Sequence, residues 1–107
     1  MPISTLLTPT ITSRAHLHTV SYLVGEDWTQ GRSLFGGIQG ALGIDALRKS
    51  LNITIPLRVA QVTFIGPVAA GTVTIETQIL RAGKNVTHAQ ARILQGDECM
   101  CLVIGIF

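Results

Sequence analysis

The chain has 107 residues and a mass of 11.4 kDa, which is enough for one domain with a single core and too little for two. Hydrophobic residues make up 47% of it and charged residues only 13%, a balance that excludes an intrinsically disordered protein. Eight basic residues are scattered among six acidic ones, so no basic block points to nucleic acid. The formal net charge of +2 is a weak bias toward small anions.

The low charge content predicts that a partner covers part of the surface. Few charged residues and a mean hydropathy of +0.45 leave little polar material for the outside of an isolated globule. We therefore expect either a homodimer or a second domain of the same kind. The N-terminus lacks the basic region of a signal peptide, and no apolar run approaches the roughly 20 residues that span a bilayer, so the cytoplasm is the expected compartment.

The first part of the chain predicts a leader followed by a strand. Residues 1–13, rich in Thr, Ser and Pro, are expected to form a loose leader in front of one domain over residues 14–107. The β-branched and aromatic content of residues 15–24 predicts a strand that ends at Gly25. Trp28 follows in a stretch without periodicity, and we expect it to anchor this loop over the next element.

One convincing helix is predicted over residues 37–51. Its apolar positions recur at helical spacing: Ala41, Ile44, Leu47 and Leu51. Three glycines spaced by three, Gly37, Gly40 and Gly43, each cost about 1 kcal/mol of helix propensity relative to alanine. They keep one side of the helix small, which favours close packing against a sheet. Asn52 is the expected stop.

The rest of the chain predicts strands joined by tight turns. The strands are expected over residues 55–65, 71–81, 86–94 and 99–107. Alternation in the third of these points Ala89, Ala91 and Ile93 inward. The element order therefore predicts an α+β domain in which one antiparallel sheet of five or six strands wraps a central helix.

The strongest local signal for a site is the glycine pair that opens the helix. Gly36 and Gly37 follow the run from Gln30 to Phe35 and lead directly into the helix. A helix N-terminus exposes unpaired backbone N–H groups and the positive end of the dipole, and glycines let a substrate atom approach them. Such a site can act as an oxyanion hole. The alternative is that the glycines only let the loop turn and the helix pack tightly.

Four motifs in order resemble a known family. Phe35-Gly36-Gly37 before a glycine- and alanine-rich helix is similar to the hotdog fold of acyl-CoA thioesterases. The run from Pro56 to Val68, the turn from Arg81 to Asn85, and the segment from Ala89 to Arg92 resemble the first repeat of the TesB-like acyl-CoA thioesterases. The resemblance covers about residues 19–107. It implies a hotdog fold and an acyl-CoA substrate.

The resemblance also implies that part of the catalytic machinery lies elsewhere. TesB-like enzymes join two hotdog repeats, and their catalytic Asp, Gln and Thr belong to the second repeat, so these residues have no counterpart in this chain. Single-repeat hotdog thioesterases carry an acidic residue on the central helix, and Asp45 lies near that depth, one position away from the expected spacing. The alternative is that Asp45 pairs with Arg48 or Lys49.

Other polar residues give weaker signals. Arg81 and Lys84 flank an expected turn, where they are candidates to bind the phosphates of CoA or are ordinary turn residues. Three strand amides are candidates to orient a thioester or a water molecule, and solvated side chains are the default: Gln61, Gln78 and Gln90.

The histidines and cysteines do not predict a metal site. His16 and His18 share a strand face and His88 lies on another strand, but no further ligand stands at metal-binding spacing, so neither metal nor cofactor is expected. Cys99 and Cys101 lie two apart on an expected strand, where disulfide geometry is poor, so we expect reduced core thiols.

The sequence thus predicts an acyl-CoA thioesterase unit, with Gly36, Gly37 and Asp45 as candidate catalytic residues and Arg81 and Lys84 as candidate CoA-binding residues. The alternative is a non-catalytic hotdog domain that binds acyl groups or supports a partner's site. A hotdog dehydratase is a weaker candidate, because it needs a paired His and Asp and the three histidines do not have that spacing.

Overall fold

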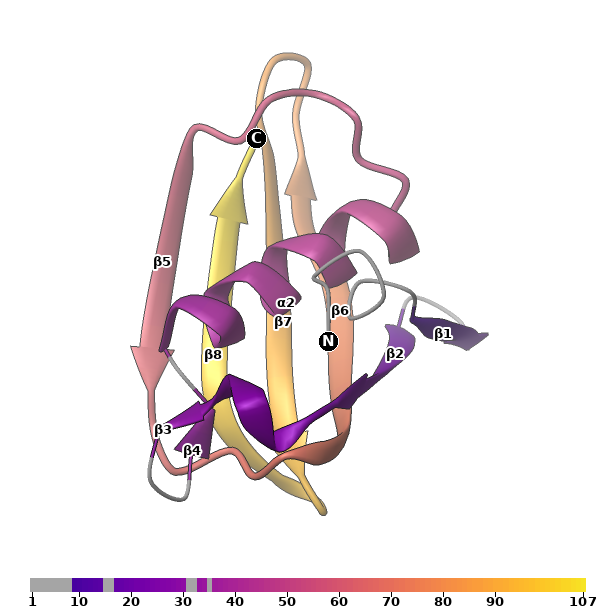
Figure 1. The fold of residues 1–107 in the computed structure, drawn as a ribbon. Helices are drawn as coiled ribbons and strands as arrows, with labels where there is room; N and C mark the ends of the chain where they lie inside the picture. The colour runs from indigo at the N-terminus through magenta and orange to yellow at the C-terminus, as the bar shows by residue number, and fades with distance from the viewer. Residues whose placement is uncertain (1–8, 15–16, 31–32, 35) are drawn as a thin grey trace.

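The computed structural model describes residues 9–14, 17–30, 33–34 and 36–107. One long helix, α2 (Gly36–Ser50), packs across one face of a curved six-stranded antiparallel sheet (Figure 1). The sheet strands are β1 (Thr10–Arg14), β2 (Leu17–Val24), β5 (Val59–Phe64), β6 (Gly71–Ala82), β7 (Thr87–Gln95) and β8 (Glu98–Ile106). A short helix, η1 (Glu26–Trp28), and a small ribbon of β3 (Thr29–Gln30) and β4 (Ser33–Leu34) connect β2 to α2. The predicted α+β arrangement is confirmed.

The strand order across the sheet is β1-β2-β6-β7-β8-β5, so β1 and β5 are its two edges. Residues 10–13, expected in a loose leader, instead belong to β1, which pairs with β2 from Thr10 opposite Ser21 to Arg14 opposite Leu17. The β-branched Thr10, Ile11 and Thr12 suit a strand, and β2 offers them a partner. The rest of the expected leader, residues 1–8, lies outside the described residues.

The strand expected from residue 55 begins only at Val59. Pro56 has no N–H to donate to a sheet ladder. The carbonyl of Ile55 instead accepts a hydrogen bond from the Arg48 guanidinium, at 2.9 Å. At Ile55 the segment between α2 and β5 is therefore held by the helix end, and the sheet takes over at Arg58, whose N–H donates to the Ile106 carbonyl at 2.7 Å.

The helix ends where expected. Asn52 has φ of 58°, the left-handed conformation that asparagine tolerates. The N–H of Ile53 then donates to the carbonyl of Arg48 at 3.0 Å, which closes a Schellman-type cap.

The face of α2 that packs on the sheet is wider than the periodic apolar positions alone. The helix buries Ile38, Gln39, Leu42, Gly43, Ala46 and Leu47. Of the periodic positions, Leu47 is fully buried, Ile44 and Leu51 pack partly buried against the core, and Ala41 is half-buried. The helix is apolar on much of its circumference, so the sheet selects the face that allows the closest approach. A Cβ on Gly43 would lie 2.6 Å from the Val103 side chain, and this glycine brings helix and sheet together.

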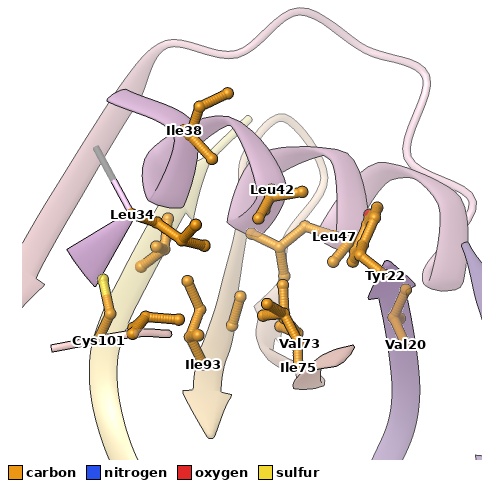
Figure 2. Close-up of a cluster of buried hydrophobic side chains, with 14 of the residues drawn as sticks. Val20, Tyr22, Leu34, Ile38, Leu42, Leu47, Val73, Ile75, Ile93 and Cys101 are labelled. Carbon is orange, nitrogen blue, oxygen red and sulfur yellow. The ribbon is translucent and has the colours of Figure 1, made fainter. Parts of the chain in front are cut away.

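The core lies between α2 and the inner face of the sheet (Figure 2). Ala89, Ala91 and Ile93 of β7 all point into it with 0% exposure, which confirms the predicted alternation. Tyr22 and Val73 add to this layer from β2 and β6. Trp28 packs against the core from η1, so its expected anchoring role is also confirmed.

The two ends of the sheet, along the direction of its strands, carry different residues. At the Gly36 end, α2 begins beside Phe64, and β2, β5 and β7 all finish there. At the Lys84 end, the β6–β7 turn and the start of β5 lie together, and the Arg48 guanidinium stacks 5.1 Å from the centre of the Phe107 ring. No helix among the described residues has the length and apolar character to cross a membrane.

Candidate functional site

A pocket of about 440 Å³ opens at the start of α2. We call it the helix-start pocket; its lining residues are Ser33, Leu34, Gly36, Gln39, Phe64, Ile65, Gly66 and Pro67. Backbone N–H groups in the first turn of a helix have no partner within the helix, and the positive end of the dipole lies there. The first turn of α2 holds no acidic side chain that would occupy these groups. The pocket therefore offers hydrogen-bond donors to an oxygen that carries negative charge.

The two glycines of this turn have different surroundings. A Cβ on Gly36 would lie 3.0 Å from Cζ of Phe64, so a side chain here would press on the ring that forms the pocket wall. A Cβ on Gly37 would meet no atom within 4 Å. The absence of a side chain thus matters to the pocket at Gly36, while the position of Gly37 is open. Phe35 lies outside the described residues.

Gln39 links the helix to the strand in front of it and was not singled out from the sequence. Its side chain is 3% exposed, and its Nε2 donates to the carbonyl of Leu34 at 3.0 Å and to Oγ of Ser33 at 3.4 Å. Because the Leu34 carbonyl needs a donor, the amide nitrogen must face it, and Oε1 is left without a partner among the described residues. The sequence signal that could have identified Gln39 is a polar residue next to Ile38 on the helix face that packs against the sheet.

Asp45 lies away from the helix-start pocket. It is nine residues from Gly36, about 2.5 helical turns, which places it on the opposite side of α2. Its Oδ2 accepts a hydrogen bond from the Tyr22 hydroxyl at 2.6 Å, and its Oδ1 lies 3.3 Å from Nζ of Lys49. Burial raises the pKa of Tyr22, and the hydrogen bond to Asp45 raises it further. These contacts match the alternative in which Asp45 pairs with Lys49.

Arg81 and Lys84 do lie together, at the Lys84 end. Both line a surface pocket of about 400 Å³ that also includes His88. Lys84 lines a neighbouring pocket of about 350 Å³ with Arg58, whose Nη2 donates to the carbonyl of Asn85 at 3.0 Å. Of the residues that the structure describes, no acidic one lines either pocket. This end of the sheet is a cationic surface that suits phosphate groups.

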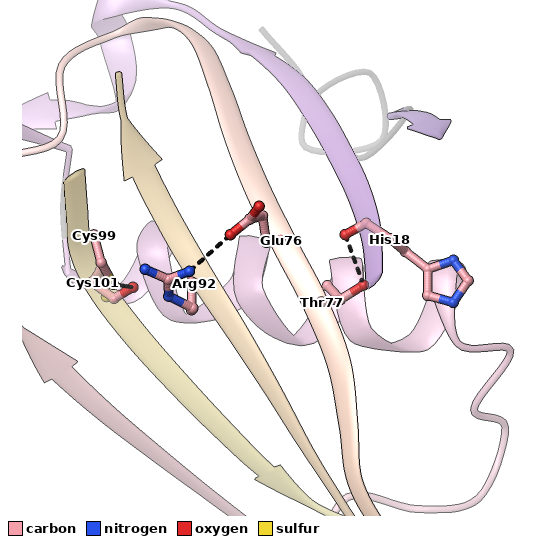
Figure 3. A network of polar contacts seen from close by, with 6 residues as sticks. All are labelled: His18, Glu76, Thr77, Arg92, Cys99 and Cys101. Atoms are coloured by element: carbon pink, nitrogen blue, oxygen red, sulfur yellow. Dashed lines mark hydrogen bonds and ion pairs between the residues drawn. The ribbon is translucent and has the colours of Figure 1, made fainter. Parts of the chain in front are cut away.

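The histidines are not gathered into one site. His16 lies outside the described residues, and β6 separates His18 on β2 from His88 on β7. Oγ1 of Thr77 donates to the His18 carbonyl at 3.5 Å, a contact drawn in Figure 3. Within the described part of the chain, no three side chains of the metal-ligating kinds cluster together.

The outer face of the sheet carries ordinary polar pairs. Arg92 and Glu76 form an ion pair of 2.9 Å across β6 and β7, and Cys99 donates through its thiol to the Cys101 carbonyl at 3.5 Å (Figure 3). Both cysteines are free thiols, as expected. Three strand amides were considered from the sequence: Gln78 lies opposite Gln90, and Gln61 is exposed on β5. None of the three lines the helix-start pocket.

A comparison with protein-family models identifies the family. Residues 24–107, well over half of the chain, match the model of the acyl-CoA thioesterase N-terminal domain. The chain belongs to this family. The match includes the helix-start pocket and the cationic end of the sheet.

Solved structures show that this acyl-CoA thioesterase domain has the hotdog fold. A phenylacetic acid degradation-related protein from Ralstonia eutropha JMP134 is similar with a TM-score of 0.84 and 16% identity, covering 97% of this chain and 86% of that one. The PaaI protein of E. coli is similar with a TM-score of 0.80 and 23% identity, covering 94% of this chain and 78% of that one. Thioesterase superfamily member 2 of Mus musculus is similar with a TM-score of 0.78 and 21% identity, covering 92% of this chain and 79% of that one. No curated protein sequence matches the chain.

Proposed function

We propose that this domain is a unit of an acyl-CoA thioesterase that hydrolyses acyl-CoA to a free acid and CoA. The helix-start pocket is the observation that carries the proposal. The thioester carbonyl oxygen would rest at the N-terminus of α2, where the N–H groups of Gly36 and Gly37 can stabilise the negative charge of the tetrahedral intermediate. The apolar side chains of Leu34, Phe64 and Ile65 would receive the start of the acyl chain.

The partner and the compartment are parts of the same proposal. The motifs from Pro56 to Val68 and from Arg81 to Asn85 favour correspondence to the first repeat of a TesB-like enzyme. A second hotdog unit, from another copy or another repeat, would supply the rest of the site. Arg81 and Lys84 would bind the phosphates of CoA. The free thiols of Cys99 and Cys101 suit a cytoplasmic location.

The test is hydrolysis of short, medium and long acyl-CoA esters by the purified chain, followed by release of free thiol. A Gly36→Val variant should lower kcat/KM at least tenfold, because the added side chain presses on Phe64 and narrows the pocket. Gly37→Ala is the matched control, since its methyl group enters open space and the backbone N–H remains. Equal activity of Gly36→Val and the wild type, with both folded, would contradict the proposed pocket.

One observation favours the alternative, a non-catalytic domain that binds acyl groups or supports a partner's site. Among the described residues, the helix-start pocket is lined by no titratable side chain, and Ser33 and Gln39 are its polar residues. None of these described lining residues is an obvious base for hydrolysis. An Asp45→Asn variant discriminates here: kcat should collapse if Asp45 is the base and should stay unchanged if Asp45 only pairs with Tyr22 and Lys49. Binding of acyl-CoA without turnover by the folded chain would establish the alternative.

A further inference from the structure

The inner end and the rim of the helix-start pocket differ in burial. Leu34 and Gln39 are each 3% exposed, whereas Phe64 and Ile65 are 57% and 60% exposed. A ligand therefore enters past Phe64 and Ile65 and ends against Leu34 and Gln39. The polar side chain at this inner end is that of Gln39.

The side-chain amide of Gln39 has a fixed orientation. Its Nε2 donates to the Leu34 carbonyl at 3.0 Å and to Oγ of Ser33 at 3.4 Å. The reversed amide would place two acceptors, Oε1 and the Leu34 carbonyl, against each other. Oε1 therefore stays on the side away from Leu34, where it is buried and has no hydrogen-bond partner among the described residues.

Ser33, the other polar side chain of the pocket, is already in hydrogen bonds. Its Oγ accepts from the N–H of Val68 at 3.0 Å and from Nε2 of Gln39, and it donates to the Leu34 carbonyl at 3.4 Å. The proton and both lone pairs of this hydroxyl are thus occupied. Among the described residues that line the pocket, Oε1 of Gln39 is the side-chain acceptor left open.

An acceptor that is buried without a donor is unfavourable, so a ligand that fits this pocket should supply the donor. A carboxylate or a second carbonyl has no proton to donate, and the positive end of the α2 dipole disfavours an ammonium group. A hydroxyl group is neutral and donates. The terminal torsion of a glutamine side chain is soft, so Oε1 can turn toward a ligand while Nε2 keeps its bond to Leu34.

The spacing along the helix limits where that hydroxyl lies on the ligand. Gly36 and Gln39 are three residues apart, about 4.5 Å along the helix axis. With the thioester carbonyl oxygen at the N-terminus of α2, a hydroxyl that reaches Oε1 must be attached close to the thioester. The second and third carbons of the acyl chain meet this condition.

We propose that the helix-start pocket recognises hydroxyacyl thioesters and that Gln39 determines this specificity. The carbonyl oxygen accepts from the N–H groups at the start of α2, and the acyl hydroxyl donates to Oε1 of Gln39. The CoA arm leaves over Phe64 and Ile65, so its own amides stay away from the inner end of the pocket. This inference rests on the proposed function, because it needs the thioester carbonyl at the start of α2.

The first experiment compares substrates on the wild-type protein. The substrates are butyryl-CoA, its 2-hydroxy and 3-hydroxy derivatives, and the corresponding methoxy derivatives, in which the oxygen has no proton to donate. We expect kcat/KM for at least one hydroxy substrate to exceed that of butyryl-CoA and of its methoxy counterpart at least tenfold. A preference over both excludes size as the cause. Equal values for the hydroxy and methoxy substrates would overturn the proposal.

The second experiment removes the acceptor with Gln39→Met, which keeps the length of the side chain. Gln61→Met is the matched control, because Gln61 is exposed on β5 and lies outside the pocket. The ratio of kcat/KM for the preferred hydroxy substrate to that for butyryl-CoA should fall at least tenfold in Gln39→Met and stay unchanged in the control. This ratio does not depend on how much of the sample is folded. An equal loss for all substrates would show that Gln39 does not contact the acyl hydroxyl and would overturn the proposal.

Binding separates this inference from the proposed function. If the wild type hydrolyses none of the thioesters, the proposed function fails, and calorimetry with the same CoA thioesters decides the inference. At least one hydroxybutyryl-CoA should then bind at least tenfold more tightly than butyryl-CoA to the wild type, and with similar affinity to Gln39→Met. No binding, or equal binding of these ligands to the wild type, would overturn the inference. Hydrolysis without any preference for a hydroxyl would overturn the inference and leave the proposed function in place.

Discussion

At the residue scale, Gly43 is the position where helix and sheet lie closest. A Cβ there would lie 2.6 to 3.2 Å from the three branch atoms of Val103, a buried β-branched side chain that has little freedom to move. Gly43→Ala should therefore lower the free energy of unfolding by about 1–3 kcal/mol, as overpacking does. Gly37→Ala is the matched control and should be neutral or stabilising by up to about 1 kcal/mol, because the site is open and alanine favours helix. Urea denaturation of both variants measures the difference.

The Tyr22–Asp45 hydrogen bond predicts a pH dependence of stability. Burial and Asp45 raise the pKa of Tyr22 above its ordinary value of 10.0, so the native state keeps the phenol neutral while the unfolded chain ionises it. The stability that the native state gains from this neutral phenol is fully present below pH 10 and is lost as the pH rises above that value. Tyr22→Phe should cost about 1.5–3 kcal/mol at neutral pH, because the hydroxyl donates to a carboxylate. Above pH 10 the stability of the Tyr22→Phe variant should fall less steeply than that of the wild type. Parallel curves of stability against pH for the two proteins would contradict this account.

The two thiols should differ in reactivity. Burial raises the pKa of Cys101 to about 11, and its side chain is 0% exposed, whereas Cys99 is partly exposed. Since the thiolate is the reactive form, a thiol reagent at pH 8 should modify Cys99 in the native protein and reach Cys101 only after unfolding. Mass spectrometry of the digested protein identifies the labelled site. Labelling of Cys101 at the same rate as Cys99 would show that β8 opens readily.

At the element scale, Gln39 joins α2 to β4. Its amide donates to the buried Leu34 carbonyl, and Ser33 in turn accepts from the N–H of Val68 at 3.0 Å. Gln39→Ala removes the shorter of two hydrogen bonds to the Leu34 carbonyl, which keeps only the 3.4 Å contact with Oγ of Ser33, and should lower the free energy of unfolding by about 1–3 kcal/mol. Gln61→Ala, an exposed glutamine on β5, should change it by less than about 0.5 kcal/mol. Equal effects of the two substitutions would mean that the β4–α2 junction adds little stability.

Alternation and turn residues were sufficient to predict most strands. They failed where a segment becomes a strand only because a neighbouring strand pairs with it. The inward set Ala89, Ala91 and Ile93 follows from a period of two, which is a property of the strand alone. The strand β1 was missed because short Thr-rich segments become strands only when a neighbour such as β2 is available. The helix was predicted to within one residue, but the extent of its buried face depends on β6, β7 and β8, the strands that it contacts most.

At the scale of the whole molecule, the separation of charge should make self-association sensitive to salt. The cationic residues Arg58, Arg81 and Lys84 lie at one end of the sheet and Asp97 and Glu98 at the other. Exposed charges are screened over about 10 Å at 0.1 M ionic strength, so the dissociation constant of a homodimer that brings opposite ends together should rise as salt is added. Sedimentation over a range of sodium chloride concentrations measures it. A constant that falls with salt would assign the association to apolar side chains alone.

The candidate site was predicted in part. Gly36 and Gly37 do form the start of a helix at a pocket, and Arg81 and Lys84 do share a surface. The nine-residue spacing is enough to turn Asp45 away from Gly36, but only the tertiary structure shows that Tyr22 is its partner. Gln39 escaped notice because its importance depends on the Leu34 carbonyl, which has no signature in the sequence.

The sequence by itself determined the types and order of the elements and the turns between them. Periodicity, β-branching and the residues at Asn52 and Gly96 are local properties, and they act within a few neighbours. Only the tertiary structure decided which helix face is buried, which strand is left as an open edge, and which polar groups meet. Those outcomes depend on contacts between segments far apart in the chain. The pocket at Gly36 and the cations at Arg58 and Lys84 accordingly lie at opposite ends of one sheet, because β5 runs about 20 Å between them.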